Sequence, residues 1–254
     1  MGQTLDIWKF FDVTHKYHAI CNPMSTAKID ELIELLKLAP ESEVLDIACG
    51  KGEILTRLAE FYGVSGVGVD ISPFCVADTK QKLQERVPNS RIEILNMNGV
   101  DYESDQLFDL TMCIGASWVY KGHRGTLRAL KTMTKMGGLV LVGEPFWIKE
   151  PEEAYLTAEG HSREEFGSHY DNVLAGKEED LLPLYTMVSN QDDWDRYVAL
   201  QWYSTARFAE ENENDPDVPE IFARINHGQA NYLQWGRDTV GWGLYLFQNT
   251  SPSH

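Results

Sequence analysis

The chain has 254 residues, of which 43% are hydrophobic and 24% are charged, which suits one large globular domain and excludes a disordered or fibrous protein. With 39 acidic and 22 basic residues the formal net charge is −17, so we expect no nucleic acid partner, because such a surface repels phosphate backbones. No apolar run approaches the roughly 18 residues of a membrane span, and the N-terminus lacks the basic-then-apolar order of a signal peptide. We therefore expect a cytoplasmic protein that contacts no membrane.

The four cysteines are far apart in the sequence and form no CxxC or Cys/His cluster. They are Cys21, Cys49, Cys75 and Cys113. This spacing indicates neither a disulfide framework nor a zinc site, and no other metal site is expected. We expect reduced thiols that are mostly buried.

The first predicted helix covers Thr26–Leu38, because apolar residues recur there at helical spacing, with Ser25 or Thr26 as its N-cap. Its apolar residues are Ile29, Leu32, Ile33 and Leu36. This face is expected to pack on a sheet. Residues 1–38 would form an N-terminal cap on the core.

Residues 40–145 alternate short β-branched runs with helical stretches, which is typical of βαβ units and a parallel sheet. The expected strands are Val44–Ala48, Gly66–Ile71, Arg91–Leu95, Phe108–Ile114 and Leu139–Glu144. Helices are expected to begin near Gly52, Pro73 and Gly122, with Ser72 as the N-cap of the second.

After Glu144 the composition becomes aromatic and acidic. We expect helical insertions over about 146–183 and 191–238 that form a lid, with strands at Leu184–Asn190 and Gly243–Gln248. The acidic stretch Glu210–Asp217 is interpreted as a solvated turn between two helices.

The most specific motif is a buried strand that runs into a Gly-x-Gly turn and then a helix, with glycines at Gly50 and Gly52. Glycine allows the tight turn and lets a ligand approach the backbone. Twenty residues after Gly50, Asp70 ends the second strand, where an acidic side chain can accept both ribose hydroxyls. A plain βαβ turn with a capping acid is the simpler alternative. The coincidence of strand, turn, helix and aspartate favours a nucleoside-containing ligand.

Two further residues separate the possible cofactors. The dinucleotide fingerprint needs Gly or Ala three residues after the second glycine, and this chain has Leu55. Asp46, at the mouth of the first strand, would repel a pyrophosphate but suits an ammonium group. The ligand that fits carries a ribose and adenine at one end and an amino acid at the other, as S-adenosylmethionine does.

With these motifs the chain resembles the class I S-adenosylmethionine-dependent methyltransferases over essentially its whole length, and most closely over residues 40–145. The resemblance implies an α/β fold with a Rossmann-like seven-stranded mixed sheet, whose last two strands are antiparallel. It also places Gly137 and Gly138 in the turn before the fifth strand. The cofactor-binding residues that it implies are Asp46, Gly50, Gly52, Asp70, Ile71, Asn98, Gly99, Gly115 and Trp118. At Asn98 and Gly99, a simple turn is the alternative to adenine contact.

More narrowly, the runs around Asn22, Glu144 and Trp194 are similar to a bacterial group of presumed small-molecule methyltransferases. Asn98 replaces the commoner Asp of the family. The Asn-Pro-Pro-aromatic tetrad of enzymes that methylate nucleic acid amino groups is missing after the fourth strand.

The candidate catalytic residues lie where the core does not need polar or aromatic groups. Glu144, at a strand end, could hold a cationic acceptor or remove a proton, or only cap the next loop. His15, Tyr17 and His18 could meet the acceptor from the N-terminal cap, or be ordinary polar residues. Trp194 shares a predicted helix face with Tyr197 and Trp202, which could pack on the sheet or form an aromatic wall.

The predicted function is methyl transfer from S-adenosylmethionine to the N, O, S or similar atom of a small-molecule acceptor. A macromolecular methyltransferase acting on RNA or protein is the main alternative, followed by a dinucleotide oxidoreductase and a non-catalytic binding protein. The acceptor's identity and the oligomeric state stay open at this point.

Overall fold

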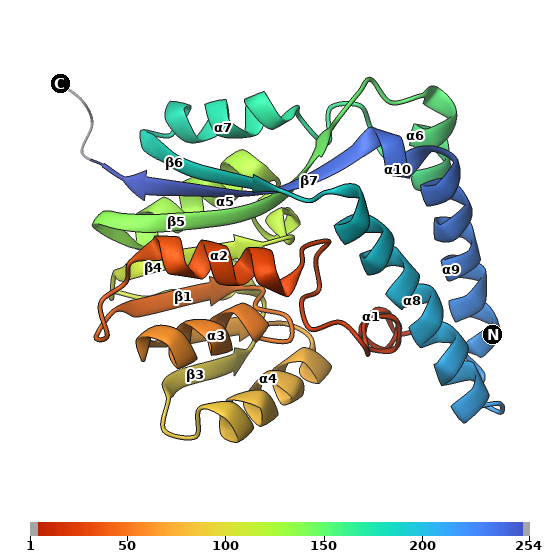
Figure 1. The fold of residues 1–254 in the computed structure, drawn as a ribbon, viewed down its shortest axis with the longest axis horizontal. Coiled ribbons are helices and arrows are strands. Elements are labelled where there is room, and N and C mark those ends of the chain that lie inside the picture. Colours follow the sequence, from red (N-terminus) through yellow and green to blue (C-terminus); the bar gives the residue numbers. More distant parts are fainter. Residues whose placement is uncertain (1–4, 251–254) are drawn as a thin grey trace.

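The computed structural model describes residues 5–250 and contains one seven-stranded sheet (Figure 1). The strand order is β3-β2-β1-β4-β5-β7-β6, and β7 is antiparallel to both of its neighbours. The strands are β1 Glu43–Ile47, β2 Ser65–Asp70, β3 Arg91–Asn96, β4 Phe108–Ile114, β5 Thr134–Trp147, β6 Leu181–Val188 and β7 Val240–Asn249. The expected Rossmann-like mixed sheet is confirmed.

Helices cover both faces of this sheet. The α-helices are α1 Ile7–Thr14, α2 Thr26–Leu36, α3 Glu53–Tyr62, α4 Pro73–Arg86, α5 His123–Met133, α6 Glu153–Glu159, α7 His169–Glu178, α8 Gln191–Glu211, α9 Val218–Asn231 and α10 Arg237–Thr239. Short 3₁₀ turns, η1 Gly99–Asp101 and η2 Ser117–Tyr120, follow β3 and β4, and a π-helical turn, η3 Tyr232–Gly236, follows α9. Helices α2, α3 and α4 pack on one face, whereas α5 and α7 pack on the other.

Strand β4 shows why the central strands are apolar on both sides. Leu110 and Met112 belong to the core on the α2–α4 side, whereas Cys113 belongs to the core on the α5 side. Because successive side chains point to opposite faces, a strand covered by helices on both sides needs a continuous apolar run.

The predicted helix starts are confirmed at two caps. The Ser72 hydroxyl accepts from the backbone N–H of Cys75, and the Ser25 hydroxyl accepts from that of Lys28. The apolar face of α2 is buried in the core, as expected. Helix α2 ends at Leu36, two residues before the predicted end, because Lys37 adopts a left-handed conformation with φ 52°.

The two strands that flank the first insertion differ from their predicted bounds. Strand β5 begins at Thr134, and Gly137, with φ 80°, lies inside it, at a shift in register against β4, rather than in a turn before it. Strand β6 ends at Val188, so Asn190 is not a strand residue but the N-cap of α8, in a capping box with Asp193. From the sequence alone, the polar residues that cap α8 cannot be distinguished from residues at the end of a strand.

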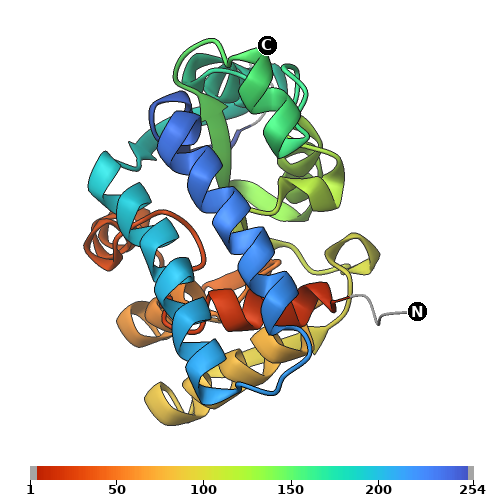
Figure 2. The same cartoon turned by 90° about the vertical axis from the view of Figure 1, so that its right-hand side faces the viewer.

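Helix α6 and the second insertion lie beyond the edge of the sheet where the parallel strands end, whereas α7 packs on a face of the sheet. Helices α6 and α7 connect β5 to β6, and α8, α9 and α10 connect β6 to β7 (Figure 1). Figure 2 shows α8 and α9 crossing this edge, with α1 beside them. A separate apolar cluster of Leu5, Val13 and Ile221 joins the N-terminal segment to α9. The N-terminal cap is therefore attached to the second insertion as well as to the core.

The acidic segment between α8 and α9 was predicted to be a solvated turn, but it also contacts α1. Helix α8 continues through Glu211, and the Nζ atom of Lys9 lies 2.8 Å from Asp215 and 2.6 Å from Asp217. These ion pairs tie α1 to the turn. Within residues 5–250 no helix is both long and apolar enough to cross a membrane.

Candidate active site

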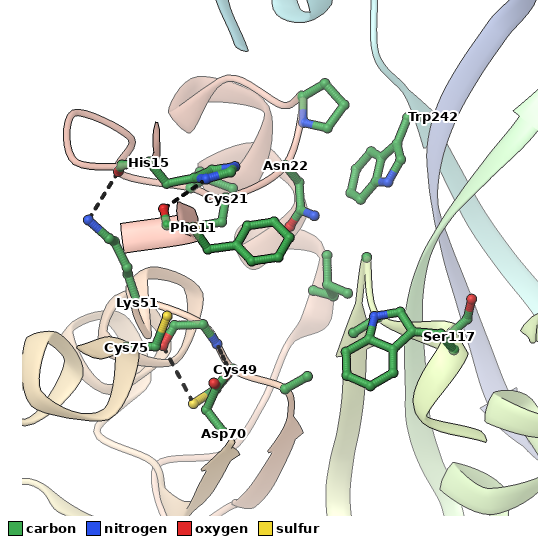
Figure 3. Close-up of a pocket in the computed structure, with 18 of the residues that line it drawn as sticks. Phe11, His15, Cys21, Asn22, Cys49, Lys51, Asp70, Cys75, Ser117 and Trp242 are labelled. Carbon is green, nitrogen blue, oxygen red and sulfur yellow. Dashed lines mark hydrogen bonds between the residues drawn. The ribbon is translucent and has the colours of Figure 1, made fainter. Parts of the chain in front are cut away.

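A cavity of about 840 Å³ lies at the sheet edge, where β1, β4 and β5 end. Helices α1 and α8, the segment before α2 and the loop before α7 complete its walls. In the close-up, Asp70 and Cys49 lie on one side of the cavity, and Ser117 and Trp242 lie on the other (Figure 3). The edge that holds the cavity is the one where open α/β sheets bind ligands.

The loop between β1 and α3 is held in an unusual backbone conformation. Ala48, Gly50 and Gly52 all have positive φ angles, of 58°, 54° and 63°. A Cβ on Gly52 would meet the Thr79 side chain at 2.2 Å, whereas a Cβ on Gly50 would meet nothing within 4 Å. Gly52 is therefore required by packing against α4, while Gly50 leaves open space beside the cavity for a ligand.

Asp70 closes this loop from the end of β2. Its carboxylate accepts from the backbone N–H groups of Gly50 and Ser72, each at 2.8 Å. Burial raises the pKa of Asp70, although these two hydrogen bonds oppose that effect. Since each carboxylate oxygen has two acceptor positions, the side chain can still accept from two hydroxyl groups of a ligand.

Asp46 is the second carboxyl group on this side of the cavity. It is buried at the end of β1, and burial, with a smaller contribution from Asp70, raises its pKa to about 8. A buried carboxylate with another carboxylate nearby needs a compensating cation. The pair therefore fits a ligand that brings hydroxyl groups to Asp70 and an ammonium group to Asp46.

On the other side, Glu144 is buried within β5, which continues to Trp147 instead of ending at Glu144 as predicted. Its Oε1 atom accepts from the Ser117 hydroxyl at 3.0 Å, and its Oε2 atom has no hydrogen-bond partner among the residues described. The nearest imidazole nitrogen, Nδ1 of His123, is 4.0 Å from Oε2. Burial raises the pKa of Glu144 to about 7, against the opposite effect of Ser117.

His15 lines the cavity, but both of its ring nitrogens are engaged. Nδ1 lies 3.1 Å from the Phe11 carbonyl, so it carries the proton, and Nε2 accepts from the Tyr197 hydroxyl at 2.9 Å. Burial and the neighbouring His18 lower the pKa of His15 to about 3. His15 is thus a neutral group that fixes the cap to α8 rather than a free base.

Tyr17 and His18 do not reach the cavity, in contrast to what we expected. The Tyr17 ring is exposed and packs edge-on against Tyr203, with the ring centroids 5.3 Å apart. His18 donates from Nε2 to the Tyr197 carbonyl at 2.8 Å and borders a separate small hollow. The turn after α1 points these two side chains toward α8, so neither faces an acceptor in the cavity.

Some of the remaining predicted residues line the cavity and others do not. Gly115, Trp118 and Trp194 line the cavity, whereas Ile71, Asn98 and Gly99 lie outside its lining. The Asn98 side chain caps η1, which matches the simpler interpretation as a turn.

Several lining residues were not anticipated from the sequence. A Cβ on Gly115 would meet the Asn22 amide nitrogen at 2.1 Å, so Asn22 sits directly on this glycine. The loop before α7 supplies Glu164, Glu165 and Phe166, and β7 supplies Trp242. These residues come from segments far apart in the sequence, and no spacing pattern connects them.

Lys51 was also missed, although it lies inside the glycine motif. Its Nζ atom donates to the His15 carbonyl at 3.0 Å and pairs with Asp78 at 3.2 Å. The Lys51 side chain therefore links the glycine loop to the N-terminal cap.

Comparison with known proteins agrees with this geometry. Residues 44–138 match the family described as a methyltransferase domain. A protein of Escherichia coli strain K12 named YjhP, described as uncharacterised, is 29% identical over 95% of this chain and 98% of its own length. This chain is an S-adenosylmethionine-dependent methyltransferase, with residues 44–138 as its methyltransferase domain.

Two solved structures match this methyltransferase along nearly its whole length. A methyltransferase from Geobacter sulfurreducens, in complex with S-adenosyl-L-homocysteine, is 29% identical, with a TM-score of 0.89 over 96% of this chain and 99% of that one. One from Thiobacillus denitrificans, in complex with the same ligand, is 29% identical, with a TM-score of 0.88 over 96% and 99%. The insertions and the cap therefore belong to the shared fold.

Proposed function

We propose that this methyltransferase binds S-adenosylmethionine between the glycine loop, Asp46 and Asp70, and transfers its methyl group to a small molecule held beside Glu144. The observation that carries the proposal is one cavity with two chemically different sides. One side has the open Gly50 turn and two carboxyl groups, and the other has a buried carboxyl group among aromatic rings. The two relatives that hold S-adenosyl-L-homocysteine support the first assignment.

The chain's residues fit such a cofactor on four points. Asp70 has acceptor positions for the two ribose hydroxyls, and the missing Cβ of Gly50 leaves room beside the loop. Asp46 lacks a cation that an amino acid ammonium group would provide. Gly115, at φ 76°, lets the chain after β4 turn beneath the cavity.

A small acceptor is favoured by the way the cavity is enclosed and charged. Helix α1, helix α8 and the loop before α7 surround the sheet edge, and the lining contains more acidic than basic residues. A polymer such as RNA needs an open, positively charged groove. We expect the protein to act in the cytoplasm on a dissolved metabolite.

Catalysis in this site rests on alignment and exclusion of water. When bound, S-adenosylmethionine supplies an electrophilic methyl group whose leaving group is a neutral thioether. The protein's task is to orient the acceptor and to shield it, which can supply several kcal/mol without covalent chemistry. Ser117 fixes the Glu144 carboxyl through Oε1 and so leaves Oε2 directed to a different partner.

The cofactor assignment is tested with Asp70→Ala and calorimetric titration of S-adenosylmethionine. Loss of two hydrogen bonds to a charged acceptor, each worth about 1.5–3 kcal/mol, should weaken binding by more than about tenfold. Asp105→Ala, which removes an exposed carboxyl group outside the cavity, is the matched control. Unchanged affinity in a folded Asp70→Ala protein, or preferential binding of NAD, would contradict the assignment.

The acceptor class is tested with methyl-labelled S-adenosylmethionine and three fractions of a bacterial extract: small molecules, RNA and protein. Label in the small-molecule fraction, with release of S-adenosylhomocysteine, is the expected result. Label on RNA or protein would support the macromolecular alternative instead.

A further inference from the structure

Four residues form a distinct corner of the cavity, away from the glycine loop. They are Ser117 and Trp118 of η2, Glu144 of β5 and Trp242 of β7, which we name the Glu144 corner, and all four line the cavity. Strand pairing places Gly243 opposite Glu144 and Trp242 opposite Pro145, so Glu144 and Trp242 approach the cavity from the two faces of the sheet. Figure 3 shows Ser117 and Trp242 on the same side of the cavity.

The Glu144 corner lacks a hydrogen-bond donor. Oε2 of Glu144 is buried and has no partner within residues 5–250. His123 cannot supply one in its neutral form, because its Nε2 donates to the Asn172 carbonyl at 2.9 Å and so its Nδ1 carries only a lone pair. A buried carboxylate oxygen without a donor is costly, so a ligand N–H directed at Oε2 would be bound favourably.

The charge around the cavity selects the kind of donor. Seven of the described lining residues are acidic and two are lysines, and that lining includes no arginine. Lys51 is engaged by His15 and Asp78, and Lys121 is exposed at the end of η2. A phosphate, carboxylate or thiolate acceptor would therefore meet mainly carboxyl groups, with the exposed Lys121 as the remaining basic group of the lining.

Aromatic rings provide the second attraction for a cation. The Trp118 side chain is 61% exposed although it lines the cavity, so its ring is available to a ligand. Trp242 lines the same cavity from the α2–α4 face of the sheet, and Phe166 enters from the loop before α7. Ring faces attract ammonium groups, and tryptophan does so most strongly.

We propose that the methyl acceptor is an amine that enters as its ammonium cation, and that Glu144 binds this cation and removes one of its protons. The inference rests on the proposed function and names the acceptor class of the same site. In the step assigned to Glu144, an N–H bond breaks, the proton passes to Oε2, and the electron pair stays on nitrogen. The amine is then a neutral nucleophile, as methylation requires.

The groups that face Glu144 are compatible with this role. Ser117 donates to Oε1 from η2, His123 approaches from α5, Cys113 lies on β4 and Tyr245 lies on β7. Burial raises the pKa of Glu144 to about 7, so the carboxyl group can exchange a proton at neutral pH. Cys113 and Tyr245 are neutral there, because burial raises the pKa of each.

The test uses the full chain saturated with S-adenosylhomocysteine, which occupies the Asp46 side, and three probes on one frame: benzylammonium, benzyl alcohol and benzoate. Dissociation constants come from tryptophan fluorescence at about pH 8. We expect benzylammonium to bind at least roughly tenfold more tightly than the other two. Glu144→Gln should bring the three probes within about threefold of one another, and Glu34→Gln, an exposed change on α2, should leave the preference intact.

The number of protons released on ligand binding distinguishes a Glu144 that exchanges a proton from a Glu144 that only contributes to the shape of the cavity. At about pH 6, where Glu144 is mostly protonated, binding of benzylammonium should release close to one proton, measured by calorimetry in buffers of different ionisation enthalpy. At about pH 8.5 the release should be near zero, and Glu144→Gln should show no such dependence on pH.

The outcomes distinguish this inference from the proposed function. If S-adenosylhomocysteine itself does not bind, the proposed function fails. If it binds, but benzoate or benzyl alcohol binds as tightly as benzylammonium to the unmodified protein, only the amine inference is overturned. A cation preference that survives in Glu144→Gln would likewise overturn the role given to Glu144.

Discussion

At the scale of single residues, the site is defined by carboxyl groups that the fold buries without a full set of partners. Glu53 is the contrasting case: burial alone would raise its pKa, but Lys82 and Arg86 lower it to about 2. Asp46 and Glu144 have no such cations, and their pKa values are raised. A raised pKa with an open cavity beside the group is typical of a ligand site, whereas a lowered pKa in an ion-pair network is typical of structure.

Asp46→Asn should stabilise the unliganded protein and weaken cofactor binding. The pKa of Asp46 rises from 3.8 to about 8 on folding, so the unfolded chain loses the Asp46 proton at a lower pH than the folded protein does. The free energy of unfolding of the wild type therefore falls as the pH rises between these two pKa values. Asparagine does not titrate. The variant should therefore be more stable by at least about 1.4 kcal/mol at pH 8, and equal to the wild type below about pH 4.

Urea unfolding of both proteins across this pH range is the measurement, with calorimetry for S-adenosylmethionine. A stability difference that does not vary with pH would show that the Asp46 carboxyl is not held in a proton-binding environment. Wild-type affinity for the cofactor in Asp46→Asn would remove the ammonium contact from the proposal.

At the scale of elements, the N-terminal cap and the second insertion form one structure around the cavity. Helix α1 is tied to α8 by the hydrogen bond between His15 and Tyr197, and to the turn after α8 by the ion pairs of Lys9. Lys51 ties the same cap to the glycine loop. Hydrogen bonds therefore link the glycine loop to the N-terminal cap and the cap to α8.

Tyr197→Phe should loosen this connection without changing the shape of the core. The substitution leaves the buried Nε2 of His15 with a weaker partner, Gln201, whose side-chain nitrogen lies 3.3 Å away. An unsatisfied buried acceptor costs about 1–3 kcal/mol, and because Gln201 satisfies this one only weakly, the free energy of unfolding should fall by up to about this amount. Tyr203→Phe, which removes a hydroxyl from an exposed ring on the same helix, is the control.

Chemical denaturation of the two variants provides the comparison. Equal stability of Tyr197→Phe and Tyr203→Phe would mean that the hydroxyl of Tyr197 does not hold the cap.

The elements also show what the sequence could and could not predict. The glycine loop and Asp70 were predicted because short-range spacing and strand ends determine them. The contact of Asn22 with Gly115, and the entry of Phe166, depend on how loops from distant segments pack, for which no periodicity exists. His18 was misplaced because the turn after α1 sets its direction, and a lone residue spacing does not encode that turn.

At the scale of the whole molecule, the sheet and its helices form a rigid base, and the cap with the second insertion forms a separate layer over its ligand-binding edge. Among the described residues, the two large cores contain the central strands, α2 to α5 and α7, and from the cap Ile20 and Met24, whereas a small cluster around Leu5, Val13 and Ile221 lies between α1 and α9. A layer with less buried apolar surface opens at a lower free-energy cost than the base. We therefore propose that residues 7–24 and 191–238 act as the lid of the cavity.

This lid should become more protected when ligand binds. The cavity walls include α1, α8 and the segment before α2, so a bound cofactor would contact both the base and the layer over it and would hold them together. Amide hydrogen exchange with and without S-adenosylhomocysteine measures this directly. We expect slower exchange in α1 and α8 with ligand, and little change in α2 and β4, which are already buried in the core. Equal exchange of α1 and α8 in both states would mean that these segments are permanent walls of the site.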